Sequence, residues 1–487
     1  MYPIKKILLI FLPLQRITIL STPVIAVSRT AEPLQPNFYE GDAVAGAHRL
    51  RMQFIVQKDP SGNFSAKMNV PAQGTFDYPA TVGYEQDSVV FRVEKPADAY
   101  FKGKIKADSI VGEWHNYGKK FPLTLRKSVD RIKLRPQYPQ PPFPYAEQDV
   151  IYYNGDSSIR YGATLTLPEK GERFPVALLI TGSGQQDRNE TLFDHQPFRV
   201  IADYLGRRGI AVLRVDDRGC GQTTGDLRQA TSEDFARDVL EGVRYLKNRP
   251  EIDPAKIGLA GHSEGGLIAL IAAQDNPDIA FIVSLAGPGV PGIEIFLSQQ
   301  EHALKKIISD RTVIDAAQAL NRSIYTDLIA NPQQKAEVIF SGQLKKWVAE
   351  QDSGTVKKVM PSLPSEHYLE PDSLTKLVGP MNIPWYRYFM ASDPGKLIGQ
   401  IRCPMLILNG EKDMQVYCDL NMDGLEKSCR EAGKTNVEFR RFPGLNHLFQ
   451  HCETGEPDEY GSIDETFAPE ALDLIAEWIG KTTGSSR

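Results

Sequence analysis

Cysteine is scarce in this sequence, with five residues among 487, and the number is odd. So few cysteines argue against a disulfide-rich scaffold, and no paired Cys/His spacing typical of a metal site occurs. Cys418 and Cys429 fall within one predicted helix, about three turns apart, which is too far for a bond between them. We therefore expect no metal and no cofactor, and one or two disulfides late in the chain only if it is exported.

An excess of positive charge is also missing, because 56 Lys and Arg residues face 61 Asp and Glu residues, for a net charge of -5. This balance provides neither the basic surface of a nucleic-acid-binding protein nor a polybasic membrane signal. Hydrophobic residues make up 41% and charged residues 24%, as is typical of a soluble globular protein. A chain of this length exceeds one compact core, so we expect two or three domains.

Long apolar runs are confined to the N-terminus. Two lysines there precede the runs Ile7–Leu14 and Ile17–Val27. This pattern predicts a signal peptide over residues 1–31 and an exported protein, periplasmic or secreted. A membrane-anchoring helix is the less favoured alternative, because Arg16 would lie inside the bilayer, and we expect no stable membrane insertion.

Residues 32–134 alternate apolar and polar positions in short segments separated by turn signals. This pattern predicts an accessory domain that is an antiparallel sandwich or a small barrel. We find no catalytic constellation in it, and we interpret His115 beside Trp114 as a surface or packing residue. The proline-dense residues 135–148 are predicted to form a semi-rigid linker to the next unit.

Residues 149–487 alternate apolar runs with amphipathic segments. The runs Pro175–Ile180 and Ile210–Val215 are typical of strands buried on both faces, and Phe198–Arg207 and Glu233–Lys247 are typical of helices. This order predicts an α/β fold, a doubly wound and mostly parallel sheet. The alternation stops at about residues 288–400, where the pattern indicates an insert of helices.

A G-x-S-x-G pattern with Ser263 at its centre lies between a predicted strand, residues 257–260, and a predicted helix, residues 267–272. A strand that turns directly into a helix forces its serine into a strained conformation, expected at φ > 0, and presents the hydroxyl at the positive helix end. Gly261 and Gly265 are needed because a Cβ would collide there. The pattern can occur by chance, but its flanking elements favour this turn.

A serine hydroxyl needs a base within reach, and the base needs a group that orients it. His447 follows the last predicted strand, and Asp413 follows the strand before it. We predict a catalytic triad of Ser263, Asp413 and His447, in the chain order Ser, acid, His. His451 is the alternative base and Glu411 the alternative acid, whereas His262 is interpreted as structural.

Two backbone N–H groups are predicted to stabilise an oxyanion. One belongs to Glu264, directly after the nucleophile, and the other to Ser183 in the loop after a predicted strand, with Gly184 as the alternative. This loop partly matches a dinucleotide-binding motif, but Asp187 stands in place of the third glycine, so we do not expect nucleotide binding.

Four motifs together resemble the α/β-hydrolase superfamily, and within it the bacterial carboxylesterase or serine aminopeptidase-like subgroup, which is also described as prolyl-oligopeptidase-like or esterase D-type. They are residues 182–188 (GSGQQDR), 217–221 (DRGCG), 261–265 (GHSEG) and 444–447 (GLNH). The resemblance covers roughly residues 149–479. Cys220, where the subgroup suggests an aliphatic residue, departs from the pattern without affecting the triad.

The resemblance implies that the insert at about residues 288–400 is a lid that shapes the acyl pocket. Trp385 and Tyr388 are candidates for lining this pocket, and the alternative is that this aromatic cluster only docks the lid on the core. The resemblance also implies that the Asp217–Arg218 turn braces the loops of the site through an ion pair.

The expected function is hydrolysis of small-molecule carboxylic esters through an acyl-enzyme intermediate. The alternative is a prolyl-oligopeptidase-type peptidase, which needs carboxylates for a substrate amino terminus, and Glu366, Glu370 and Asp372 are available in the insert. A third and less favoured hypothesis is a non-catalytic envelope- or carbohydrate-binding protein that uses the N-terminal β domain.

Overall fold

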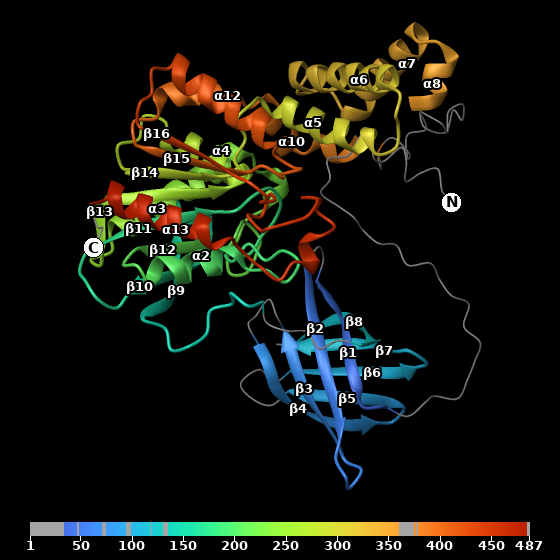
Figure 1. Cartoon of the computed structure of the whole chain (residues 1–487). Coiled ribbons are helices and arrows are strands. Elements are labelled where there is room, and N and C mark those ends of the chain that lie inside the picture. The colour runs from blue at the N-terminus through green and yellow to red at the C-terminus, as the bar shows by residue number, and fades with distance from the viewer. Residues whose placement is uncertain are drawn as a thin grey trace. The chain divides into compact units, whose positions relative to one another are not determined.

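The computed structural model describes residues 34–484 except 46–47, 71–74, 94–98, 117, 130–134, 360–374 and 376–377. The predicted signal peptide lies outside these residues. The chain forms two compact units: the first reaches Tyr138 and also takes in Leu192–His195, and the second consists of Pro139–Thr191 and Gln196–Arg487 (Figure 1). Within the described residues, no helix has the length and apolar character needed to cross a bilayer.

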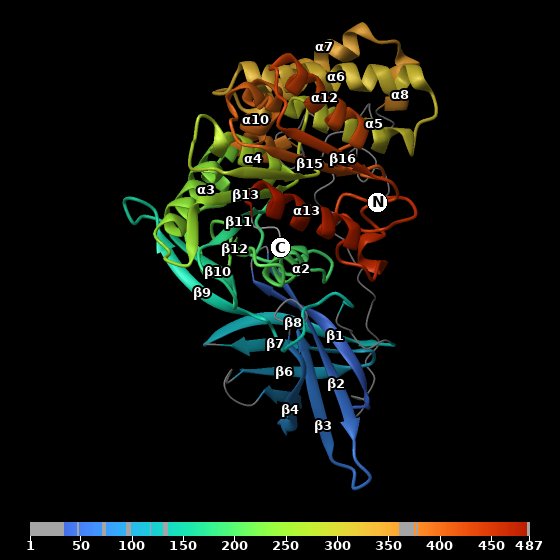
Figure 2. The ribbon, with the colours of Figure 1, turned by 60° about the vertical axis from the view of Figure 1, so that its left-hand side comes forward.

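The first unit is a closed barrel of eight antiparallel strands, in which each strand pairs with the next and β1 pairs with β8 (Figure 2). A barrel was one of the two predicted forms. The strands are β1 (Asn37–Ala45), β2 (His48–Lys58), β3 (Phe64–Val70), β4 (Thr75–Glu85), β5 (Ser88–Val93), β6 (Ala99–Lys106), β7 (Ser109–Asn116) and β8 (Lys119–Ser128).

The barrel interior is filled by aromatic rings from alternating strand positions. Phe54, Phe91 and Phe101 are fully buried, and the ring centroids of Phe54 and Phe91 lie 4.8 Å apart. Trp114 packs beside Phe54, whereas the neighbouring His115 is only partly buried and stacks on Tyr100. Alternation along each strand therefore places one set of side chains in the core and the other outside.

The second unit contains an eight-stranded mixed sheet with the order β16-β15-β14-β13-β11-β12-β10-β9. The pairs β9–β10 and β10–β12 are antiparallel and the remaining pairs are parallel, so the predicted mostly parallel α/β sheet is confirmed. The strands are β9 (Tyr145–Tyr153), β10 (Arg160–Pro168), β11 (Phe174–Ile180), β12 (Ala211–Val215), β13 (Ile252–His262), β14 (Phe281–Leu285), β15 (Met405–Gly410) and β16 (Val437–Phe442).

Helices cover both faces of this sheet. Along β11, Val176 and Leu178 pack with α3 (Ser232–Lys247), α4 (Glu264–Ala273) and α12 (Cys418–Glu431), whereas Ala177 and Leu179 pack with α2 (Pro197–Gly206) and α13 (Pro469–Thr482). All seven residues of β11 are buried, as expected of a strand covered on both faces. All five cysteines in the described residues are free.

The segment between β14 and β15 is a helical insert, as predicted, with a hydrophobic core of its own that includes Phe296, Tyr325 and Phe340. Its described elements are α5 (Gly292–Lys305), α6 (Arg311–Ala330), α7 (Ala336–Glu350), α8 (Ser353–Val359), η4 (Gly379–Asn382), α10 (Pro384–Ala391), α11 (Pro394–Leu397) and η5 (Ile398–Gln400). In Figures 1 and 2 the long helices α5, α6 and α7 lie together beyond the β14–β16 side of the sheet.

Replacing Phe101 by Ala should lower the free energy of unfolding of the barrel by about 3–5 kcal/mol, because it leaves a cavity among stacked rings. Denaturant unfolding can be followed by the fluorescence of Trp114, which is the barrel's own tryptophan. The matched control is Val111→Ala on β7, where the side chain is 38% exposed and the cost should stay below about 0.5 kcal/mol. Equal denaturant midpoints of unfolding for Phe101→Ala and Val111→Ala would contradict this account of the barrel core.

Candidate active site

Ser263 occupies the turn between β13 and α4. Its backbone has φ 54° and ψ -124°, so the predicted strained conformation is confirmed. A Cβ on Gly261 would lie 2.0 Å from the carbonyl oxygen of Gly265, and a Cβ on Gly265 would lie 2.2 Å from that of Ile180. Only glycine fits at either position, because both obstacles are backbone atoms. The turn thus places the serine directly at the N-terminus of α4.

Asp413 and His447 are brought together by the loops that follow β15 and β16. Asp413 Oδ2 lies 2.7 Å from His447 Nδ1, and both side chains are buried. The other carboxylate oxygen, Oδ1, accepts hydrogen bonds from the N–H groups of Gln415 and Val416, each at 2.8 Å. A carboxylate held at both oxygens accepts a hydrogen bond from the Nδ1–H of the imidazole, which favours the tautomer whose Nε2 keeps its lone pair.

His262, directly before the serine, links the turn to the His447 loop. Its Nε2 lies 2.9 Å from the carbonyl oxygen of His447, and its Nδ1 lies 2.8 Å from Glu190 Oε1. A carbonyl and a carboxylate can only accept, so this arrangement favours the positively charged imidazolium, in which both ring nitrogens donate. Burial alone would lower the pKa of His262, but the Glu190 carboxylate and the His447 carbonyl raise it overall.

The same Glu190 oxygen also accepts a hydrogen bond from the N–H of Gly182, at 2.9 Å. Glu190 is buried and has φ 53°. One carboxylate therefore holds the loop after β11, the turn before Ser263 and, through His262, the loop that carries His447. His262 was expected to be structural, and this network gives it such a role.

The loop after β11 approaches Ser263 closely: a Cβ on Gly182 would lie 3.1 Å from the Cβ of Ser263. Ser183, the predicted oxyanion donor, lines the same pocket as Ser263. Among the hydrogen bonds found in the described residues, none uses the N–H of Ser183 or of Glu264. The oxyanion role of these two N–H groups stays a prediction.

Asp217 and Arg218 both brace this part of the molecule, but they act separately. Asp217 accepts hydrogen bonds from the Thr181 hydroxyl (2.7 Å) and the Gln186 N–H (2.8 Å), which fixes the loop around Ser183. Burial raises the pKa of Asp217 well above its usual range. The ion pair that the resemblance implied is made by Arg218 with Asp238 of α3, at 2.6 Å.

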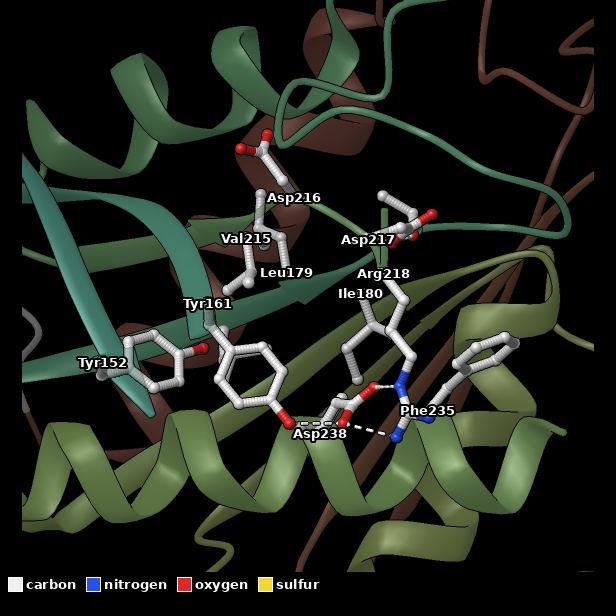
Figure 3. Close-up of a pocket in the computed structure, with 13 residues that line it drawn as sticks. Tyr152, Tyr161, Leu179, Ile180, Val215, Asp216, Asp217, Arg218, Phe235 and Asp238 are labelled. Carbon is white, nitrogen blue, oxygen red and sulfur yellow. Dashed lines mark hydrogen bonds and ion pairs between the residues drawn. The ribbon is translucent and has the colours of Figure 1, made fainter. Parts of the chain in front are cut away.

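Figure 3 shows how Arg218 and the Tyr161 hydroxyl converge on Asp238, at the edge of a cavity of about 60 Å³. Asp217 and Thr181 line the same cavity. Neither Ser183 nor Ser263 is among the described residues that line it.

A separate pocket of about 40 Å³ lies at Ser263. None of the described residues that line it is charged, and its walls come from the insert, from the loop of Ser183 and from the residues after Asp413. Besides Ser183 and Ser263, the lining consists of Pro288, Ile295, Phe296, Gln299, Trp385, Phe389, Gln415 and Val416. Of the two aromatic candidates, Trp385 lines this pocket, whereas Tyr388 is not in the lining and lies near Glu233 and Arg237 of α3.

The alternative base and acid lie in other surroundings. His451 is 55% exposed and pairs with Glu465 and Glu470, and Glu411 is exposed. The hydrogen bonds of the described residues do not include one between the Ser263 hydroxyl and His447, so the complete triad stays a prediction. Such bonds are often long in a free enzyme and shorten when substrate binds. In the described part of the chain, no group of three His, Cys, Asp or Glu residues could hold a metal.

Residues 195–453, more than half of the chain, match the family described as serine aminopeptidase, S33. The chain belongs to this family. Ser263, Asp413 and His447 all fall inside the matched range. The S33 match and the observed sheet agree with the α/β-hydrolase fold that the sequence motifs implied.

Two curated proteins are similar to this S33 family member. It is 24% identical over 322 residues to esterase EstD of Thermotoga maritima, with 65% of either chain covered. It is 32% identical over 119 residues to thiohydrolase aneE of Aspergillus aculeatus, which covers 24% of this chain and 36% of the other. The chain thus spans less than two thirds of the length of these relatives. A solved esterase of Pyrococcus furiosus matches 70% of this chain and 92% of its own, with 16% identity and a TM-score of 0.42.

Glu190 was not predicted from the sequence, although three site loops depend on it. A buried glutamate within a polar loop has no local pattern that separates it from an exposed one. The one available signal is its place in the loop that follows β11, at the carboxyl edge of the sheet where site residues of such folds gather.

Replacing Gly265 by Ala should disrupt the turn, because its Cβ would collide with the carbonyl oxygen of Ile180. We expect a loss of at least about 2 kcal/mol in the free energy of unfolding. The matched control is Gly342→Ala in α7, where a Cβ meets nothing within 4 Å and helix propensity should stabilise the protein by up to about 1 kcal/mol. Thermal unfolding of both variants tests this, and a Gly265→Ala protein as stable as wild type would refute it.

The His262–Glu190 pair should make stability depend on pH. The pKa of His262 is higher in the folded protein than the 6.5 of a free imidazole. The stabilisation that the charged His262 gives to the folded state is therefore complete below about pH 6.5. It is lost as the pH rises through the pKa that His262 has in the folded protein. Between these two pH values, the free energy of unfolding of wild type should fall by up to about 1.4 kcal/mol per pH unit relative to that of His262→Gln. Glu190→Gln should also remove this dependence of the free energy of unfolding on pH. Parallel pH curves for wild type and both variants, measured by urea unfolding, would rule out the charged pair.

Proposed function

We propose that this protein is a carboxylic ester hydrolase in which Ser263 is the nucleophile, His447 the general base and Asp413 the group that orients it. The observation that carries the proposal is the buried hydrogen bond between Asp413 and His447 at the same sheet edge as the strained turn of Ser263. Each residue follows its own strand, in the order expected of this fold.

In the proposed reaction the Ser263 hydroxyl oxygen attacks the ester carbonyl carbon while His447 Nε2 takes its proton. Asp413 stabilises the resulting imidazolium and keeps its orientation. The N–H groups of Ser183 and Glu264 stabilise the oxyanion, a contribution of about 10²–10³ in rate for each donor. The imidazolium then protonates the leaving alcohol, and water activated by the same imidazole hydrolyses the acyl-enzyme.

The helical insert acts as a lid in this proposal. Support comes from the pocket at Ser263, where four of the ten lining residues are Ile295 and Phe296 of α5 and Trp385 and Phe389 of α10. A wall of aliphatic and aromatic side chains favours an acyl group over a polar one, because burial of apolar surface drives its binding.

An ester is favoured over a peptide because an aminopeptidase must bind a charged substrate amino group. None of the described residues that line the pocket offers a carboxylate for that purpose. Glu366, Glu370 and Asp372, proposed for this role from the sequence, lie outside the described residues. The family description names an aminopeptidase, whereas the relatives reported above are named an esterase and a thiohydrolase, so peptidase activity is the outcome to test against.

Ser263→Ala should reduce kcat/KM for p-nitrophenyl acetate by at least about 10⁴-fold, and Asp413→Asn by about 10³–10⁴-fold, because the imidazole is no longer held in the required tautomer. A fluorophosphonate probe should label wild type and not Ser263→Ala. His451→Ala is the matched control and should keep wild-type activity, because that imidazole pairs with Glu465 and Glu470 instead.

Aminoacyl-anilides assayed beside the esters separate the two reactions. Faster turnover of the anilides than of the esters would favour the peptidase over the esterase. A wild-type protein that the fluorophosphonate probe does not label would favour a binding protein without catalytic activity.

A further inference from the structure

Glu264 has a side chain that the proposed mechanism does not use. Only its backbone N–H serves as an oxyanion donor there, and its carboxylate points into the protein, where it is 2% exposed. Burial raises the pKa of Glu264, and no positively charged side chain is among its partners in the described residues. Burying a carboxylate costs folding free energy unless hydrogen bonds compensate for it. The partners of this carboxylate therefore indicate which part of the structure it holds in place.

Two donors from different segments hydrogen-bond to this carboxylate, and the Ser183 side chain also interacts with it. The Ser232 hydroxyl, at the start of α3, donates to Glu264 Oε1 at 2.6 Å, and the Trp385 indole N–H of α10 donates to the same oxygen at 2.7 Å. The interaction with Ser183 lowers the pKa of Glu264, against the larger effect of burial. The position at the N-terminus of α4 also favours negative charge.

Two of these partners, Trp385 and Ser183, are walls of the pocket at Ser263. Trp385 also stacks on Phe389 (centroids 5.3 Å apart) and meets the edge of Phe296 (6.5 Å), and both of these rings line the same pocket. The indole has one donor, and Glu264 binds it. The hydrogen bond therefore fixes the orientation of the indole ring in the pocket wall more sharply than packing against Phe296 and Phe389 would do alone.

We propose that Glu264 is a positioning residue that sets the acyl-chain length accepted at Ser263, by holding the Trp385 ring across the pocket. This inference rests on the proposed ester hydrolysis. With the ring held, the pocket at Ser263 is small, about 40 Å³. It therefore takes a short acyl group such as acetyl or propionyl and excludes a long chain.

The test compares kcat/KM for p-nitrophenyl acetate and octanoate in the full-length protein. Wild type should prefer acetate. In Glu264→Leu, which removes the acceptor at similar volume, the acetate-to-octanoate ratio should fall at least about 10-fold as the ring is released. Trp385→Phe keeps an aromatic ring without the N–H and should change the ratio in the same direction. Glu264→Gln keeps an acceptor oxygen and should keep the wild-type ratio.

A double-mutant cycle shows whether the two side chains act together. In the Glu264→Leu background, Trp385→Phe should change the ratio by less than about 2-fold, because the bond is already lost. The matched control is Ser232→Ala, which removes a partner outside the pocket and should leave the ratio unchanged. In ¹⁵N spectra the Trp385 indole signal, assigned by its loss in Trp385→Phe, should move in Glu264→Leu.

An unchanged ratio in both Glu264→Leu and Trp385→Phe, with ester turnover intact, would overturn the inference and leave the proposed function standing. If Glu264→Leu does not fold, Trp385→Phe and Glu264→Gln decide the question: a lowered ratio in Trp385→Phe with the wild-type ratio in Glu264→Gln supports the inference, and an unchanged ratio in Trp385→Phe overturns it. Wild type that hydrolyses neither ester would overturn the proposed function itself, so the two failures are distinguished by the wild-type assay.

Discussion

The ion pair between His262 and Glu190 is the interaction on which the site depends. It is buried, and its members hydrogen-bond to Gly182 on one side and to the backbone of His447 on the other. The loops after β11, β13 and β16 are thereby held at one sheet edge by a single charged pair. A buried pair of this kind contributes little net stability but strongly penalises arrangements in which either charge loses its partner. Its effect is to specify one arrangement of the three loops.

Much of the second unit could be predicted from the sequence because its signals are local. The turn at Ser263 carries its own constraints, since Gly261 and Gly265 are required by backbone contacts only a few residues away. The loops of Asp413 and His447 follow from strand order in a parallel sheet. Helices α2 and α3 begin within about one residue of the predicted positions, because their buried faces recur with the helical period.

What could not be predicted depends on contacts between distant segments. The carboxylates of Glu190 and Glu264 have partners that no spacing in the sequence relates to them, and the partner of Arg218 proved to be Asp238 on the next helix. Tyr388 and Trp385 share one helix and similar chemistry, yet only the latter lines the pocket, because the face of α10 that meets the site is set by the packing of the insert. The choice between sandwich and barrel had the same origin, since alternation predicts the buried face of each strand but not the β1–β8 pairing that closes the barrel.

Closure of the barrel has a consequence for how this unit can meet other molecules. Every described strand of it has a partner on either side, and β1 pairs with β8 at Phe38–Glu40, so the described strands leave little free edge to which a strand from another chain could be added. Closure therefore disfavours β-augmentation, a common way for extended peptides to bind sheets. Whatever the barrel recognises must contact its outward side chains or its loops.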